Sequence, residues 1–192
     1  EVLMKYITLS ILLFILISCV TTETNNPNDD ANSGMVYGKG HAFFVTAPNG
    51  WVLDNVNGVP YGLFATFYPK NKTFNLDELI IYVNVVHRQE IGEISVEEFI
   101  QNDNSSIQNK YPSIIIKKGN NIEISNNNSA IIVNYFNDIN NYYESVAFID
   151  EERVIVLIVL SCRSIQEHTD SYNSFIEVVK SYFFITKNLY MY

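Results

Sequence analysis

The chain has 192 residues, of which 47% are hydrophobic and 14% aromatic, so it is long enough to bury one sizeable core. Its 21 acidic residues outweigh 12 basic residues and give a net charge of −9. An acidic surface repels phosphate backbones, and no basic patch interleaved with aromatic residues occurs, so we expect no nucleic-acid partner.

Residues 1–18 have the pattern of an export signal. Met4 is followed at once by a lysine, which indicates that translation begins at Met4, and residues 7–17 are almost wholly apolar. This run has the length of the apolar region of a signal peptide and is too short to cross a membrane as a helix. It ends in the lipobox sequence Leu-Ile-Ser-Cys, which predicts cleavage between Ser18 and Cys19 and attachment of a diacylglyceryl group to the Cys19 thiol. The alternative is an uncleaved apolar anchor in which Cys19 has no role.

A lipidated Cys19 would place the chain in a bacterial cell envelope. Two or three acyl chains hold a protein stably at a membrane, whereas a single chain binds only marginally. Val20 follows the cysteine, and no aspartate stands there to favour retention in the inner membrane. We therefore expect an anchor in the outer membrane rather than the inner one.

The rest of the chain divides into a tether, a domain and a short tail. Residues 20–34 are polar and show no apolar periodicity, so they bury too little surface to offset their ordering entropy. We assign the lipidated cysteine and a flexible tether to residues 19–37, one folded domain to residues 38–187, and a C-terminal tail to residues 188–192.

Segments rich in β-branched and aromatic residues, bounded by turn residues, predict the strands of the domain. In chain order these strands are residues 41–47, 51–53, 63–68, 78–87, 114–118, 122–125, 130–137, 142–149 and 153–162. The last two flank a short acidic turn and form the clearest hairpin, and Asn-rich turns separate the three before them. This punctuation indicates antiparallel pairing.

Two segments predict helices. Ser95 is followed three residues later by Glu98, and Ser164 by Glu167, so each serine can cap the amide of the glutamate. Pro112 stops the first helix. At helical spacing, the second segment carries the apolar residues Tyr172, Phe175, Ile176, Val179 and Phe183. We expect this apolar stripe to pack into the core.

The most apolar strands should be central. Residues 78–87 are largely apolar on both faces, and residues 154–160 are apolar at every position. Such strands need cover on each side of the sheet, either from helices on both faces or from a helix on one face together with the first strands. The expected fold class is therefore α+β, with a central antiparallel β-sheet sandwiched by helices.

The order of these elements resembles the PsbP-like group, which includes the Mog-type Ran-binding proteins and bacterial DcrB-like lipoproteins. The residues that carry the resemblance are Pro48, Gly50 and Trp51, Ser95 to Phe99, Phe148 to Asp150, Leu160 to Arg163, and Phe175 to Tyr182. The resemblance implies an antiparallel sheet between helical layers and a domain that binds macromolecules. No set of binding residues carries over, because the partner surfaces of these proteins are not shared motifs.

The histidines are the candidates for an enzyme site. His41, His87 and His168 lie at a strand start, a strand end and a helix start, and none has metal-ligand spacing. No nucleophile elbow or phosphate-binding glycine loop occurs. We therefore predict no catalytic residue, metal or cofactor, and a non-enzymatic binding or structural module. The alternative is an envelope hydrolase or metal-dependent enzyme with a site near the three histidines.

Cys162 and two arginines have competing interpretations. Once Cys19 carries lipid, Cys162 has no intrachain partner, so it is either a buried apolar residue or a reactive thiol. Arg153 and Arg163 bracket the most apolar strand. We expect them to pair with Asp150 and Glu144 across the hairpin, the alternative being that they bind an anion.

Aromatic residues between positions 51 and 68 are more numerous than a core requires. We expect them to form an exposed rim that binds an envelope protein or a glycan, because flat aromatic side chains gain contact area at low entropy cost. The candidate partner surface consists of Trp51, Tyr61, Phe64, Phe67 and Tyr68.

Overall fold

The computed structural model describes residues 33–187. The strands are β1 (Ser33–Gly38), β2 (His41–Thr46), β3 (Trp51–Asp54), β4 (Ala65–Pro69), β5 (Ile80–His87), β6 (Ile115–Lys118), β7 (Ile122–Glu123), β8 (Ser129–Asn137), β9 (Tyr142–Asp150), β10 (Val154–Cys162) and β11 (Phe183–Thr186). The helices are α2 (Arg88–Ile91), α3 (Val96–Lys110) and α4 (Ile165–Ser181), with short 3-10 turns η1 (Val59–Tyr61), η2 (Ser125–Asn127) and η3 (Asp138–Asn140).

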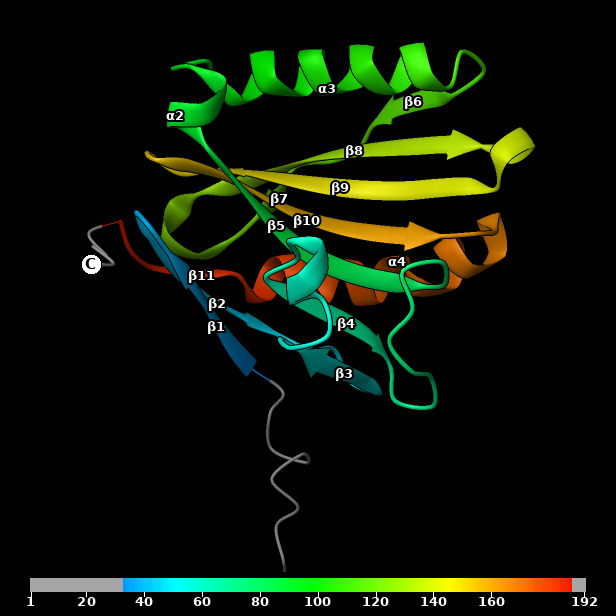
Figure 1. The fold of residues 1–192 in the computed structure, drawn as a ribbon, viewed down its shortest axis with the longest axis horizontal. Helices are drawn as coiled ribbons and strands as arrows, with labels where there is room; N and C mark the ends of the chain where they lie inside the picture. The colour runs from blue at the N-terminus through cyan, green and yellow to red at the C-terminus, as the bar shows by residue number, and fades with distance from the viewer. Residues whose placement is uncertain (1–32, 188–192) are drawn as a thin grey trace, which may run out of the picture. The chain divides into compact units, whose positions relative to one another are not determined.

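The strands form two antiparallel sheets (Figure 1). The main sheet has the order β3-β4-β5-β10-β9-β8-β6. β7 also pairs with β8, at a part of β8 that precedes the part paired with β6. The small sheet has the order β1-β2-β11. The predicted α+β class with a central antiparallel sheet is confirmed, and the apolar strands β5 and β10 lie side by side within the main sheet.

Alternation along β10 explains how one sheet supports two cores. Ile155 and Val159 face the core under α3, where Val96 and Ile100 of the helix are buried. Val156, Ile158 and Leu160 face the opposite core, which α4 and the small sheet share. Helix α3 runs along the first face in Figure 1. The second face is thus covered by α4 and the small sheet. Of the two arrangements expected from the sequence, this is the one with a helix and the first strands on one face.

Both predicted helix starts are confirmed. Ser95 Oγ accepts the Glu98 amide at 3.1 Å, and Ser164 Oγ accepts the Glu167 amide at 3.2 Å. Helix α3 continues through its Asn- and Ser-rich stretch because that stretch makes a tertiary contact: the Tyr135 hydroxyl donates to the Asn104 side chain at 2.8 Å. Poor intrinsic helix formers are therefore compensated by packing.

Two edge strands differ from the sequence-based expectation. β1 begins at Ser33, so residues 33–37 belong to the domain rather than to the tether. Gly34 lies against Leu53, where an added Cβ would stand 2.5 Å from a leucine methyl, and Val36 is buried. The lipobox at Ser18 and Cys19, the tether up to residue 32 and the tail at 188–192 lie outside the described residues.

The second difference is at the end of α4. The helix stops at Ser181, whose Oγ accepts the Thr46 amide at 2.8 Å and so joins the chain to β2. Phe183 therefore lies in β11 opposite Phe44 and is exposed, instead of continuing the buried helical stripe. Among the helices of residues 33–187, none is both long enough and apolar enough to cross a membrane.

Candidate functional site

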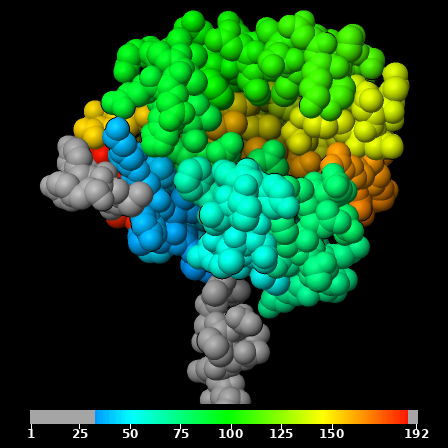
Figure 2. Space-filling view, viewed as in Figure 1, coloured from blue at the N-terminus to red at the C-terminus, as the bar shows by residue number. Residues whose placement is uncertain are grey.

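The connection between β3 and β4, here called the 55–64 loop, exposes a group of apolar side chains. Its exposed fractions are 70% for Val56, 59% for Val59, 62% for Tyr61 and 37% for Phe64. Figure 2 shows this loop, coloured cyan, on the face in view. Gly62 ends η1 with a φ of 75°, a left-handed conformation that glycine adopts without strain. Apolar residues gathered in this way are typical of interaction surfaces.

A single aspartate fixes the start of this loop. Asp54 Oδ1 accepts the amides of Val56 and Asn57 at 2.8 and 2.9 Å. Asp54 Oδ2 accepts the Asn57 side chain at 2.6 Å and the Tyr68 hydroxyl at 3.0 Å. Burial opposes ionisation of Asp54, but these hydrogen bonds outweigh it and lower the pKa of the carboxyl group. Asp54 therefore holds the start of the loop through polar contacts, whereas Phe64 and Tyr61 also make ring contacts with His41 and Phe74.

The five predicted aromatic residues divide between surface and core. Tyr61 and Phe64 are exposed on the loop, whereas Trp51 is only 7% exposed and Phe67 is fully buried. Trp51 and Phe67 face inward from β3 and β4 into the core that the small sheet covers, so they were wrongly placed on a partner surface. Tyr68 is half-buried and is occupied by its bond to Asp54.

A polar cleft of about 460 Å³ lies between the β1–β2 turn, the end of β5 and the β9–β10 turn. Its lining includes Lys39, His87, Arg88 and Arg153. Of the three histidines, His87 lines this cleft, whereas His168 lines a shallower hollow beside Phe136 and Tyr172. The chemistry of the cleft depends on how many of its lining side chains are already engaged.

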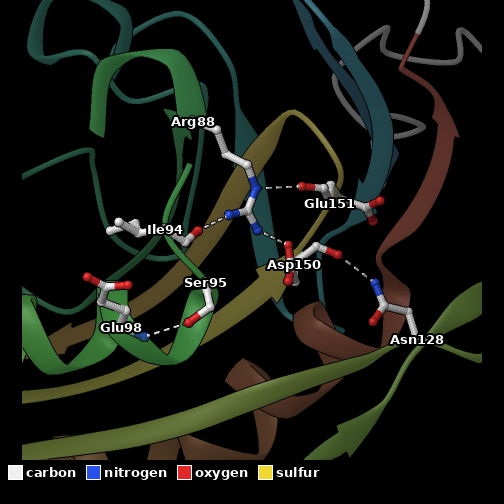
Figure 3. Close-up of polar contacts among 7 residues, drawn as sticks. All are labelled: Arg88, Ile94, Ser95, Glu98, Asn128, Asp150 and Glu151. Atoms are coloured by element: carbon white, nitrogen blue, oxygen red, sulfur yellow. Dashed lines mark hydrogen bonds and ion pairs between the residues drawn. The ribbon is translucent and has the colours of Figure 1, made fainter. Parts of the chain in front are cut away.

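Arg88 is engaged by the protein itself (Figure 3). Its guanidinium donates to the backbone carbonyls of Ile94 and Glu151 and pairs with the Asp150 carboxylate. The Asn128 side chain donates to the Asp150 carbonyl at 3.0 Å from the other side. Arg88 thus joins the α2–α3 connection to the β9–β10 turn and has a structural role in the cleft wall.

This pairing corrects the expected partners of the hairpin carboxylates. Asp150 pairs with Arg88, which the sequence did not suggest as its partner. The Arg163 guanidinium lies 3.1 Å from the Asp77 carboxylate. Glu144 instead accepts the Tyr142 hydroxyl at 2.5 Å.

The structure brings two of the three histidines together. The ring centroids of His41 and His87 are 5.7 Å apart, at the start of β2 and the end of β5. His41 is buried, and burial followed by the neighbouring His87 lowers its pKa, which the Lys39 backbone partly opposes. His87 reaches the cleft.

His168 has a different environment. Its ring nitrogen lies 2.7 Å from Ser145 Oγ, and its ring packs edge-on against Phe136. Burial lowers the pKa of His168 and favours the neutral ring. Over residues 33–187, no group of three or more His, Cys, Asp or Glu side chains is placed to hold a metal ion.

Cys162 lies at the end of β10 and is almost completely buried. Burial is the largest cause that raises the pKa of its thiol, to about 12. A thiol in this state is a weak nucleophile at neutral pH. The geometry favours the interpretation of Cys162 as a packed apolar residue.

A half-buried pair of carboxyl groups, Glu144 and Asp103, was missed by sequence reasoning. Burial is the first cause that raises the pKa of both Glu144 and Asp103, and the charge of Asp103 adds to the effect at Glu144. The Tyr142 hydroxyl donates to Glu144, and the Tyr135 hydroxyl lies 3.3 Å from Asp103. Glu144 stands between Tyr142 and Val146 on the face of β9 that packs under α3, and an acidic residue in the interior of this largely apolar strand is the one local signal that pointed to it.

Comparisons with known proteins bear on the fold. No family model matches the chain, and no curated protein matches its sequence. Among solved structures, the chain is similar to the solution structure of cyanobacterial PsbP (CyanoP) from Synechocystis, with a TM-score of 0.50 and 12% sequence identity. The match covers 81% of this chain and 94% of that one. The fold of residues 33–187 is therefore PsbP-like, as the order of elements in the sequence led us to expect.

Proposed function

We propose that this chain is a lipid-anchored protein of the bacterial cell envelope whose domain binds a protein partner without catalysis. The anchor is the acylated Cys19, and the outer membrane is its place in cells that have one. The 55–64 loop is the binding surface. The observation that carries the proposal is the exposure of Val56, Val59, Tyr61 and Phe64 on a loop that Asp54 already holds in place.

A rigid apolar loop is suited to binding because little conformational entropy is lost when a partner covers it. The backbone bonds to Asp54 fix the loop before any partner arrives. The exposed parts of its apolar side chains are therefore available for association. Tyr61 is of the residue type most enriched at the energetic centres of interfaces.

The composition of the loop favours a protein over a glycan. Sugars stack on aromatic rings, but the most exposed apolar side chain of the loop is the aliphatic Val56, and the aliphatic Val59 is almost as exposed as Tyr61. Aliphatic groups gain free energy by contact with other apolar side chains. A protein partner with an apolar pocket or groove fits this surface better than a carbohydrate does.

The test is cross-linking of the acylated protein in its own envelope, followed by affinity measurement with the recovered partner. The Val59→Ser/Tyr61→Ser variant should bind the partner at least roughly tenfold more weakly than the wild type, because it removes the centre of the surface. Ile139→Ser is the matched control, since Ile139 is also strongly exposed but lies in η3. Equal affinities of the two variants would contradict the assignment of the loop, and recovery of glycan alone would contradict the protein partner.

The anchor has a separate test. Cells fed with labelled fatty acid should label the wild-type protein and leave Cys19→Ala unlabelled and unprocessed. Equal labelling of both would refute lipidation at Cys19. This outcome is independent of the binding experiment.

One observation favours an envelope enzyme as a second candidate function: the His41–His87 pair lies beside the cleft of about 460 Å³. His87 lines the cleft, whereas His41 is buried behind it, so His87 is the side chain that would meet a substrate. Purified protein screened against ester and phosphoester substrates should then lose turnover on His87→Gln substitution. Turnover that survives this substitution would remove the candidate site.

A further inference from the structure

The small sheet has an outer face that no part of the described chain covers. Its apolar side chains are Met35, Tyr37, Phe44 and Phe183, which we call the outer face. Their exposed fractions are 47%, 54%, 42% and 51%. Phe44 of β2 pairs with Met35 of β1 on one side and with Phe183 of β11 on the other. These three side chains form a continuous apolar row across the sheet.

The same strands bury most of the apolar side chains on their other face. Val36 pairs with Phe43, and Phe184 pairs with Phe43 from the other side, in the core that the main sheet shares. The inner side chains therefore account for the packing of the small sheet. The side chains of the outer row lie outside this core and are about half exposed, so their apolar character indicates contact with another molecule or surface.

The charge of the small sheet differs from that of the whole chain. Residues 33–47 and 183–187 contain two lysines, Lys39 and Lys187, and no Asp or Glu, although the chain has 21 acidic residues. Lys187 pairs with Glu152 of the β9–β10 turn, and Lys39 is exposed at the tip of the β1–β2 turn. The outer face is thus free of acidic residues on its own strands, which suits a surface of anionic lipid headgroups.

Chain connectivity makes β1 of this sheet the first described strand after the proposed anchor. Residues 20–32 separate Cys19 from Ser33, the first residue of β1. This segment spans at most about 50 Å when fully extended. An acylated Cys19 would therefore keep the start of β1 within about 50 Å of the bilayer surface.

We propose that the outer face docks onto the lipid bilayer that holds the anchor, with its aromatic and Met side chains at the headgroup boundary. The proposal rests on the lipid anchor at Cys19 proposed above. Phe, Tyr and Met side chains gain apolar contact at this depth, and Lys39 remains in the headgroup layer. The tether then limits the distance, and the outer face fixes the orientation of the domain.

The test places a fluorescent reporter on the outer face of the full acylated chain in vesicles that contain anionic lipid. Trp51 is the single tryptophan of the chain and is buried, so it adds a constant background. Phe44→Trp supplies the reporter, and Ile139→Trp is the matched control at an exposed site in η3. Lipids brominated in the upper acyl chain should quench the Phe44→Trp protein severalfold more than the Ile139→Trp protein, with a shift of emission to shorter wavelength.

A second variant keeps the proposal falsifiable without disturbing the core. Met35→Ser/Phe183→Ser, added to the Phe44→Trp protein, should reduce the quenching while the lipid keeps the protein on the vesicles. Equal quenching of the Phe44→Trp and Ile139→Trp proteins would overturn the proposal. If the Phe44→Trp protein already emits at the shorter wavelength without vesicles, the proposal is also overturned. A second copy of the chain or residues 188–192 would then cover the face in place of lipid.

The anchor and the face fail in different ways. If labelled fatty acid does not attach to Cys19, the proposed anchor is refuted whatever the fluorescence shows. The unacylated Phe44→Trp protein, titrated with the same vesicles, should still be quenched more than its Ile139→Trp counterpart. If the Phe44→Trp protein is quenched neither in the acylated nor in the unacylated form, the docking face is refuted and the anchor is not.

Discussion

The Asp54 carboxylate should be the main local source of stability for the 55–64 loop. Asp54→Ala removes the acceptor of four hydrogen bonds. Two are donated by backbone amides and two by the side chains of Asn57 and Tyr68. A typical hydrogen bond contributes about 1 kcal/mol net, and water can reach the exposed amides of Val56 and Asn57 in the variant. The expected loss in the free energy of unfolding is therefore about 2–3 kcal/mol.

Urea denaturation followed by far-ultraviolet circular dichroism measures this loss. Tyr68→Phe removes one of the four donors and should cost about 1 kcal/mol. An Asp54→Ala protein that unfolds within about 0.5 kcal/mol of the wild type, as for an ordinary surface substitution, would refute the reasoning. So would a Tyr68→Phe protein that is destabilised as much as Asp54→Ala.

The pH dependence gives an independent check on Asp54. Its pKa is lowered in the folded state, so the folded protein favours the ionised carboxylate. The resulting stability is fully present above the pKa of the unfolded chain, about 3.9, and is lost as the pH falls below it towards the folded-state value. Asp54→Asn should lack this part of the acid-induced loss.

Three further predictions concern the interior. Arg88→Met should lower the free energy of unfolding by about 3 kcal/mol because it leaves Asp150 and two carbonyls without their donor; a smaller loss than in Asp150→Asn would contradict the bracing role. Cys162, in a Cys19→Ala background, should react with a thiol reagent at pH 8 only after addition of denaturant, because burial raises its pKa to about 12; rapid reaction of the native protein would contradict its burial. Burial raises the pKa of Glu144, so the stability linked to its neutral form is present below the unfolded-state pKa of about 4.3 and is lost as the pH rises through the folded-state value. Glu144→Gln should remove that loss between acidic and neutral pH, and an unchanged urea midpoint profile would show that Glu144 does not cause it.

The elements with local signals were predictable from the sequence. Ser95 and Ser164 cap helices through bonds to residues three positions later, and that spacing is visible in the sequence. The hairpin of β9 and β10 needed only two apolar runs and a short polar turn. In each case the interacting residues are close in sequence, so the pattern contains the whole interaction.

Long-range packing set the limits of prediction. Trp51 and Phe67 are core residues, whereas Tyr61 and Phe64 are exposed, although all four belong to one aromatic run. What separates them is the small sheet, which covers the core beside β3 and β4. No local pattern encodes that cover.

The small sheet itself is assembled from opposite ends of the domain. β1 and β11 pair with β2 on its two sides, and neither has an apolar run long enough to stand out as a strand. Arg88 and Asp150 likewise meet across 62 positions of sequence. Residues this far apart in sequence are brought together only by the whole fold. Sequence reasoning therefore proposed arginines that flank the neighbouring strand as partners of Asp150 instead of Arg88.

The separation of fold from surface explains why the structural likeness does not transfer a partner. At 12% identity the likeness is one of fold, and the side chains that build the two cores of this chain are buried. The 55–64 loop and the outer face of the small sheet add nothing to those cores. A PsbP-like domain with polar side chains at both places would fold equally well, because exposed side chains seldom change stability by more than about 0.5 kcal/mol. Their apolar character therefore reports on what this particular chain contacts, and substitutions there should change binding or membrane contact while leaving the unfolding transition in place.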